Sequence, residues 1–314
     1  MKNRTLKDYL VLVIKGICIG AADVVPGISG GTIAFIIGIY KELINSIKSI
    51  NLKAFKLLFS LKIAEFWKAI NGNFLLCVVL GISTSIFLLA KGIGYLLNNY
   101  PVLMWSFFFG LVIASTIYVA KTIKKWDKVT TSLGIAGIII AYCITIISPA
   151  EANTAYWFIF ISGAIAACVM ILPGVSGSFI LVLLGMYKFV LEAVSNLQVA
   201  IILTFVAGAG IGVIAFSNVL SWLLKKYYNQ TVALLAGFMV GSLNKVWPWK
   251  QVTKTFTDHH GEIRPLMEKN ILPATYEQVT GNPAFLFWAI ILTMVGFALV
   301  FVIESLTKTK NQNS

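Results

Sequence analysis

Residues 26–31 read PGISGG and residues 173–178 read PGVSGS, and each stretch interrupts a long apolar run. Proline and glycine end or bend helices, so each run is predicted to be a helical hairpin broken at the glycine-rich turn. Several of the apolar pieces beside the turns are shorter than the roughly 20 residues that a membrane-spanning helix needs. These pieces cover residues 9–22 and 32–47 in the first run, and 155–172 and 178–195 in the second.

Composition places most of the surface of this chain in lipid. Of the 314 residues, 58% are hydrophobic and 12% are charged, and the mean hydropathy is +0.87. A water-soluble fold could not bury so much apolar surface. The net charge of +13 does not indicate a nucleic-acid partner, because the lysines cluster in short stretches between apolar runs. The four cysteines stand singly inside apolar runs, which predicts packing residues rather than a zinc or redox pair.

The two halves of the chain repeat one pattern, which indicates an internal duplication. At an offset of 147 residues the matching positions include Gly16 with Gly163, Ser29-Gly30 with Ser176-Gly177, and Gly38 with Gly185. At an offset of 127 residues, Gly81 and Gly110 match Gly208 and Gly237.

Lysine distribution predicts the topology, because cytoplasmic loops are rich in Lys and Arg. Residues 2–7, 48–68, 121–128 and 225–226 are basic, whereas 98–100, 148–153 and the charge-balanced stretch 248–283 are not. A re-entrant hairpin followed by three spans in each half satisfies every assignment, and the odd number of spans makes the halves inverted. One broken span per half would instead give parallel halves, with a lysine-rich connection outside.

The predicted fold is therefore an all-α integral membrane protein built from two inverted-topology repeats, multi-pass with both termini cytoplasmic. Repeat 1, residues 1–150, comprises hairpin 9–47, a cytoplasmic amphipathic segment 48–72 and spans 74–97, 101–120 and 131–148. Repeat 2, residues 151–314, comprises hairpin 155–195, spans 199–224, 231–247 and 284–303, and an extracytoplasmic segment 248–283. Segment 48–72 is predicted to lie on the inner leaflet, and a plain solvated linker is the alternative.

Broken helices at membrane depth are tolerated only where protein or a polar cavity satisfies their backbone. Two breaks at matching positions therefore predict a binding site, and free N–H groups at the following helix starts favour a compact anion such as phosphate. Ser29 and Ser176 are expected to be N-caps or direct ligands. The alternative is that both turns are kinks that allow close helix packing. The predicted phosphate-binding residues are Gly27, Ser29, Gly30, Gly31, Thr32, Gly174, Ser176, Gly177 and Ser178.

Two of the charged residues within the predicted membrane segments are candidates for function. Asp23 precedes the first turn and is a candidate for coupling to a proton or sodium gradient, or a brace of the turn. Lys91 is a candidate partner for Asp23 or for a substrate phosphate, or it reaches toward an interface. His259-His260 is the only histidine cluster and has no cysteine nearby, so no metal site is predicted. No catalytic triad or Walker loop occurs, which argues against an enzyme.

The stretch at residues 20–32, GAADVVPGISGGT, followed by Gly38-Ile39-Tyr40, resembles the bacterial polyprenyl-phosphate transporter family called PopT. The likeness covers nearly the whole chain. It implies recycling of undecaprenyl phosphate from the outer to the inner leaflet of the bacterial cytoplasmic membrane for cell-envelope synthesis. No cofactor is predicted. The phosphate head would bind at the turns while the isoprenoid tail stays in lipid, with the repeats giving alternating access. A small inorganic anion transporter or channel is the main alternative, followed by a membrane lipid-phosphate enzyme.

Overall fold

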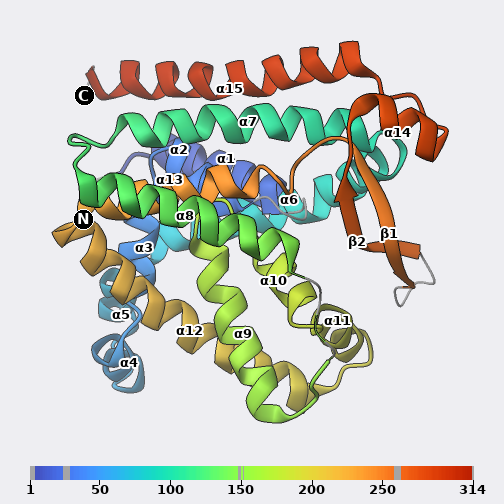
Figure 1. The fold of residues 1–314 in the computed structure, drawn as a ribbon. Helices are drawn as coiled ribbons and strands as arrows, with labels where there is room; N and C mark the ends of the chain where they lie inside the picture. Colours follow the sequence, from blue (N-terminus) through green and yellow to red (C-terminus); the bar gives the residue numbers. More distant parts are fainter. Residues whose placement is uncertain (1–3, 24–28, 148–149, 151, 258–262, 313–314) are drawn as a thin grey trace.

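The computed structural model describes residues 4–23, 29–147, 150, 152–257 and 263–312 (Figure 1). Within these ranges, five helices are long and apolar enough to cross a membrane. They confirm the predicted multi-pass, mainly helical membrane protein. They are α6 (Gly72–Asn99), α7 (Pro101–Lys121), α8 (Lys128–Ile146), α12 (Val199–Lys226) and α15 (Leu286–Gln312).

Each half of the chain begins with three shorter helices. In the first half these are α1 (Leu6–Asp23), α2 (Gly30–Ile36) and α3 (Tyr40–Lys48), and in the second α9 (Tyr156–Ile171), α10 (Gly177–Leu183) and α11 (Tyr187–Ser195). The chain turns between the second and third helix of each set at a glycine with positive φ, +74° at Gly38 and +70° at Gly185. The bend between α10 and α11 is 107°, which suits a re-entrant segment or a broken span. Both halves thus share one order of elements, while their inverted relation stays a prediction.

Glycines let the first helix of each half pack closely against a long helix. A Cβ atom on Gly16 of α1 would lie 2.5 Å from the carbonyl oxygen of Val78 in α6, and Gly163 of α9 lies in the same way against Phe205 of α12. Only a residue without a side chain permits such an approach. The glycines that match in sequence therefore occupy equivalent helix crossings.

Other helix pairs join the two halves. Helix α7 packs along α15 (Figure 1), and α8 packs along α13 (Tyr228–Ser242). Helix α13 has 15 residues and ends before the predicted span 231–247 does. A short helix suffices there because α13 is packed between α7 and α8 and leaves little backbone to lipid.

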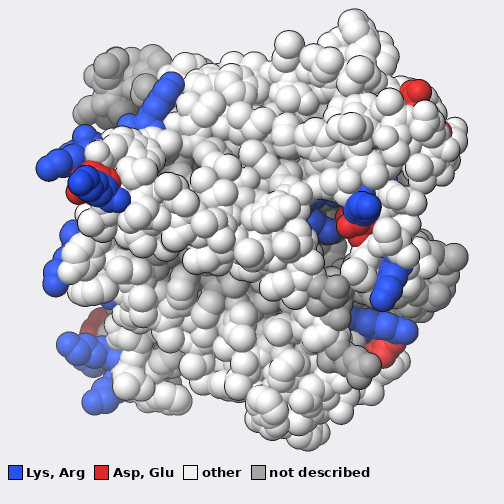
Figure 2. Space-filling model, viewed as in Figure 1, with Lys and Arg blue, Asp and Glu red and all other residues white. Residues whose placement is uncertain are grey.

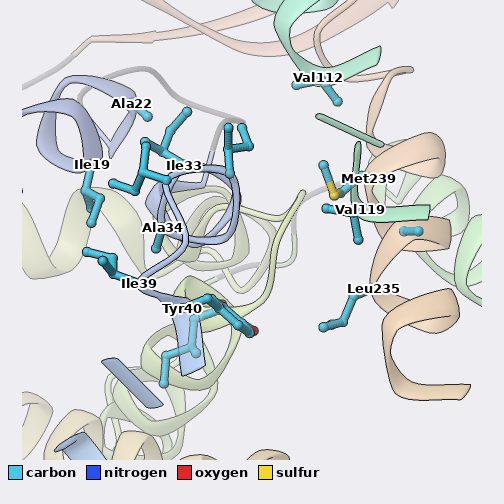
Figure 3. Close-up of a cluster of buried hydrophobic side chains, with 14 of the residues drawn as sticks. Ile19, Ala22, Ile33, Ala34, Ile39, Tyr40, Val112, Val119, Leu235 and Met239 are labelled. Carbon is cyan, nitrogen blue, oxygen red and sulfur yellow. The ribbon is translucent and has the colours of Figure 1, made fainter. Parts of the chain in front are cut away.

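A buried apolar core ties the first hairpin to this set of helices. Ile33 and Ala34 of α2 belong to the same cluster as Val112 of α7 and Met239 of α13, as Figure 3 shows. Hydrophobic burial therefore fixes the position of the helix that follows the first glycine-rich turn.

Segment 48–72 forms two short helices, α4 (Leu52–Phe59) and α5 (Ile63–Ala69). Leu52, Phe59 and Leu61 are each more than 80% exposed, as expected of a segment that lies on a lipid surface. Its contact with the inner leaflet stays a prediction.

Segment 248–283 departs from the all-α prediction. It contains an antiparallel ribbon of β1 (Lys250–Thr257) and β2 (Ile263–Asn270), followed by α14 (Pro273–Thr280). The run VTKTFT in β1 is rich in β-branched residues, which favours a strand. His259-His260 lies outside the described residues.

Charged side chains gather at the two ends of the molecule. Figure 2 shows lysines and arginines at the end that carries the labelled chain termini in Figure 1, a broad band of uncharged surface, and a second charged area beside the β-ribbon. Such a band is the surface that lipid tails cover.

Candidate functional site

The two glycine-rich turns meet in the interior. The hydroxyl of Ser29 donates a hydrogen bond to the carbonyl oxygen of Leu172 at 2.8 Å, and the Gly174 N–H donates one to Oγ1 of Thr32 at 3.0 Å. Ser29 and Thr32 are both 1% exposed. The predicted site residues from the two halves therefore lie side by side, although residues 24–28, with Pro26 and Gly27, lie outside the described residues.

The start of α2 is already satisfied within the protein. The Gly30 N–H donates to Oδ1 of Asp23 at 2.7 Å, the Gly31 N–H to Oγ of Ser29 at 3.1 Å, and the Thr32 N–H to the Ser29 carbonyl at 2.9 Å. Ser29 is the N-cap, as predicted. The prediction that these three N–H groups are free is wrong in this conformation, because a carboxylate and the cap occupy them.

Asp23 makes the hydrogen bond that a brace of the turn requires. A Cβ atom on Gly30 would lie 2.5 Å from Oδ2 of Asp23, so this glycine also makes room for the carboxylate. Lys91 belongs to α6, but its side chain lies outside the described residues. The structure therefore supports the structural role of Asp23, and its coupling role stays a prediction.

The start of α10 is open in comparison. Ser176 is the N-cap residue, but its side chain accepts no backbone N–H, and its hydroxyl lies 2.7 Å from the hydroxyl of Ser178. Across the described ranges, the N–H groups of Gly177 and Ser178 have no hydrogen-bond partner. The second turn is thus the one of the two whose donors are available.

A small cavity lies against this second turn and connects it to charged residues. Gly174 and Ser176 share its wall with Thr145 of α8, Phe179 of α10 and Lys245, which follows α13. Thr145, Phe179 and Lys245 also line a neighbouring cavity of about 320 Å³. The larger cavity therefore leads toward the turn.

The larger cavity brings together three charged groups that the sequence analysis missed as site residues. Nζ of Lys245 lies 3.0 Å from Oε2 of Glu268, and Nζ of Lys250 lies 3.5 Å from the same oxygen. Figure 2 shows positive and negative atoms together in a hollow beside the β-ribbon. The available signal was Lys245, a charged residue inside the predicted span 231–247.

The environment shifts the protonation of two of these groups. Burial lowers the pKa of Lys250 to about 8, an effect that attraction to Glu268 opposes and repulsion from Lys245 reinforces. Burial would raise the pKa of the Glu268 carboxyl, but Lys250 and Lys245 outweigh burial and hold that pKa below its usual range. Glu268 is therefore a carboxylate at neutral pH.

The described residues contain no group of three His, Cys, Asp or Glu side chains that could hold a metal ion. Their polar groups provide lysine ammonium groups, hydroxyls and backbone N–H donors. Such a set can bind an anion without forming or breaking a covalent bond.

Known proteins are similar to this chain over most of its length. A model of the VCA0040-like family, described as undecaprenyl phosphate translocase-like, matches residues 19–264. A polyprenyl-phosphate transporter of Vibrio cholerae is 44% identical over 304 residues, which cover 97% of this chain and 98% of the relative. A polyprenyl-phosphate transporter of Staphylococcus aureus is 33% identical over 254 residues, covering 75% and 85%.

No solved structure matches this chain. The family description and both relatives' names refer to transport rather than to catalysis. The resemblance noted at residues 20–32 is confirmed.

Proposed function

We propose that this chain, which belongs to the undecaprenyl phosphate translocase-like family, transports a polyprenyl phosphate across a bacterial cytoplasmic membrane. The proposed substrate is undecaprenyl phosphate, returned from the outer to the inner leaflet for reuse in cell-envelope synthesis. Both termini and segment 48–72 would then be cytoplasmic, with the β-ribbon outside.

The observation that carries this proposal is a cavity with a charged wall and an apolar, exposed rim. Lys245 and Lys250 line it, and so do Ile146 and Ile147, which are 58% and 55% exposed. A small inorganic anion makes no favourable contact with apolar side chains at an opening. A lipid, in contrast, can place its phosphate near the lysines and its tail beside the isoleucines. The cavity therefore favours a lipid phosphate over a small inorganic anion.

The contact between the two turns supports a proposed mechanism of alternating access. In this conformation the N–H groups of Gly177 and Ser178 have no hydrogen-bond partner among the described residues, while those of Gly30 and Gly31 are held by Asp23 and Ser29. A second state that releases Gly30 from Asp23 would offer the first turn to the phosphate instead. The nine residues predicted from the sequence would then serve in two alternating groups.

The test is transport by purified protein in lipid vesicles that contain no other protein. A fluorescent polyprenyl phosphate in the outer leaflet should become protected from a membrane-impermeant quencher much faster than in protein-free vesicles. Uptake of inorganic phosphate without lipid movement would instead establish an anion transporter. Release of phosphate from the lipid would establish an enzyme.

A further inference from the structure

The cavity between α8, α10 and β2 carries positive charge that its own residues do not neutralise. Lys245, Lys250 and Lys269 line it, with Glu268 as the acidic residue on its described wall. Lys245 and Lys250 share one oxygen of that carboxylate. An additional anion is the ligand that completes such a set.

Lys250 is a buried ammonium group with too few hydrogen-bond acceptors around it. Its side chain is 6% exposed, and its Nζ lies 3.6 Å from the centroid of the Trp105 ring. Nζ forms the ion pair with Glu268 but no hydrogen bond of good geometry among the described residues. A buried ammonium in this situation has donors to spare, and burying them unsatisfied costs free energy.

Neighbouring amides hold the wall of the cavity in place. Nδ2 of Asn270 donates to the carbonyl oxygen and to Oδ1 of Asn244, at 2.7 and 2.8 Å, and Nδ2 of Asn244 donates to Oγ1 of Thr145 at 2.7 Å. This chain of bonds fastens β2 to α8. The position of Glu268 beside the lysines is therefore set before any ligand arrives.

We propose that this cavity is the first docking site for the phosphate monoester head of the lipid, which displaces Glu268 from Lys245 and Lys250. The inference rests on the proposed function. Glu268 offers both lysines one shared oxygen, whereas a phosphate monoester offers three oxygens and up to two negative charges. Because Lys245 also lines the small cavity at Ser176, the head group can pass to the second turn without leaving this lysine.

The test is equilibrium binding of farnesyl phosphate to purified protein in phosphatidylcholine nanodiscs. Lys245→Gln and Lys250→Gln should each weaken binding about ten- to a hundredfold, the effect of losing a charge-assisted hydrogen bond. Lys254→Gln is the matched control, because Lys254 lies on the same strand as Lys250 but is exposed and does not line the cavity. Farnesol and inorganic phosphate separate the contribution of the tail from that of the head.

Glu268→Gln gives the sharpest result, because docking and a purely structural ion pair predict opposite signs. If Glu268 competes with the ligand, its removal should tighten binding of farnesyl phosphate severalfold. Weaker or unchanged binding would overturn the proposal, as would wild-type affinity in both lysine variants. Binding of inorganic phosphate as tight as that of farnesyl phosphate would overturn the lipid assignment.

Folding and transport measurements keep these outcomes distinct. Gel filtration and thermal unfolding establish whether each variant is folded. If Lys250→Gln does not fold, binding to Lys245→Gln still tests the proposal, because Lys245 is less buried. If the wild-type protein flips polyprenyl phosphate but the lysine substitutions leave the affinity for farnesyl phosphate unchanged, the docking site alone is refuted. If the wild-type protein moves no lipid, the proposed function itself fails.

Discussion

Thr32→Val tests whether the contact between the two turns defines one conformation of the transporter. Valine has the shape of threonine but no hydroxyl, so the buried N–H of Gly174 loses its acceptor at 3.0 Å. Leaving a buried N–H unsatisfied costs about 1–3 kcal/mol. If this contact exists in one state only, the same free energy shifts the equilibrium away from that state by roughly 5- to 150-fold.

The assay is the accessibility of a single cysteine at Val182, which lines the larger cavity. Labelling from the side of the β-ribbon should slow in Thr32→Val, because the conformation with the cavity open becomes less populated. Thr116→Val is the matched control, since the hydroxyl of Thr116 bonds to the Val112 carbonyl within its own helix. Equal labelling rates and equal unfolding free energies for the two variants would refute the reasoning.

Three further predictions concern topology, coupling and pH. Single cysteines at Asn99 and Asn153 should react with an impermeant reagent from outside, whereas Ser60, Lys125 and Asn229 should not; labelling of Ser60 from outside would contradict the inverted hairpins. Asp23→Asn keeps an acceptor for the Gly30 N–H and should fold, yet transport should no longer follow a proton or sodium gradient; an unchanged dependence in transport assays would leave Asp23 as a brace. Binding of farnesyl phosphate should weaken as pH rises through about 8, because Lys250 is protonated below its pKa and neutral above it. Lys245, Lys269, Glu268 and Tyr142 also line the cavity. Binding should therefore be measured between about pH 7.5 and 9.5, where the Glu268 carboxylate and the phosphate are already fully ionised. If the affinity of a Lys250→Arg variant falls with pH as steeply as that of the wild type, the pH dependence does not come from Lys250.

Local sequence signals were sufficient for the membrane class and for the broken helices. The apolar runs and the Pro-Gly turns act over a few neighbouring residues, so they can be recognised without knowing the fold. The N-cap role of Ser29 is of the same kind, because the cap and its N–H partner are two residues apart. The pairing of Gly30 with Asp23 is different, because these two residues belong to separate helices whose relative placement the local sequence does not determine.

The grouping of Lys245, Lys250 and Glu268 in one cavity could not be predicted from such signals. Lys245 follows a helix, while Glu268 meets it only because β2 returns antiparallel to β1. Charges in segment 248–283 were used to assign a side of the membrane, and a sum of charges contains no information on which residues face one another. The strands themselves were missed because a short ribbon outside the membrane has a weak pattern amid strong apolar helices.

The packing of helices from one half against helices from the other has a consequence for how such a protein arose. Gly110 of α7 and Gly296 of α15 let these two helices approach, and Gly137 of α8 and Gly237 of α13 do the same for the other pair. A polypeptide with only one half would leave these glycine faces without a partner. If the two halves arose by duplication, as the sequence predicts, the ancestral unit would have needed a second copy of itself, and the present chain would correspond to a homodimer whose two subunits became covalently joined.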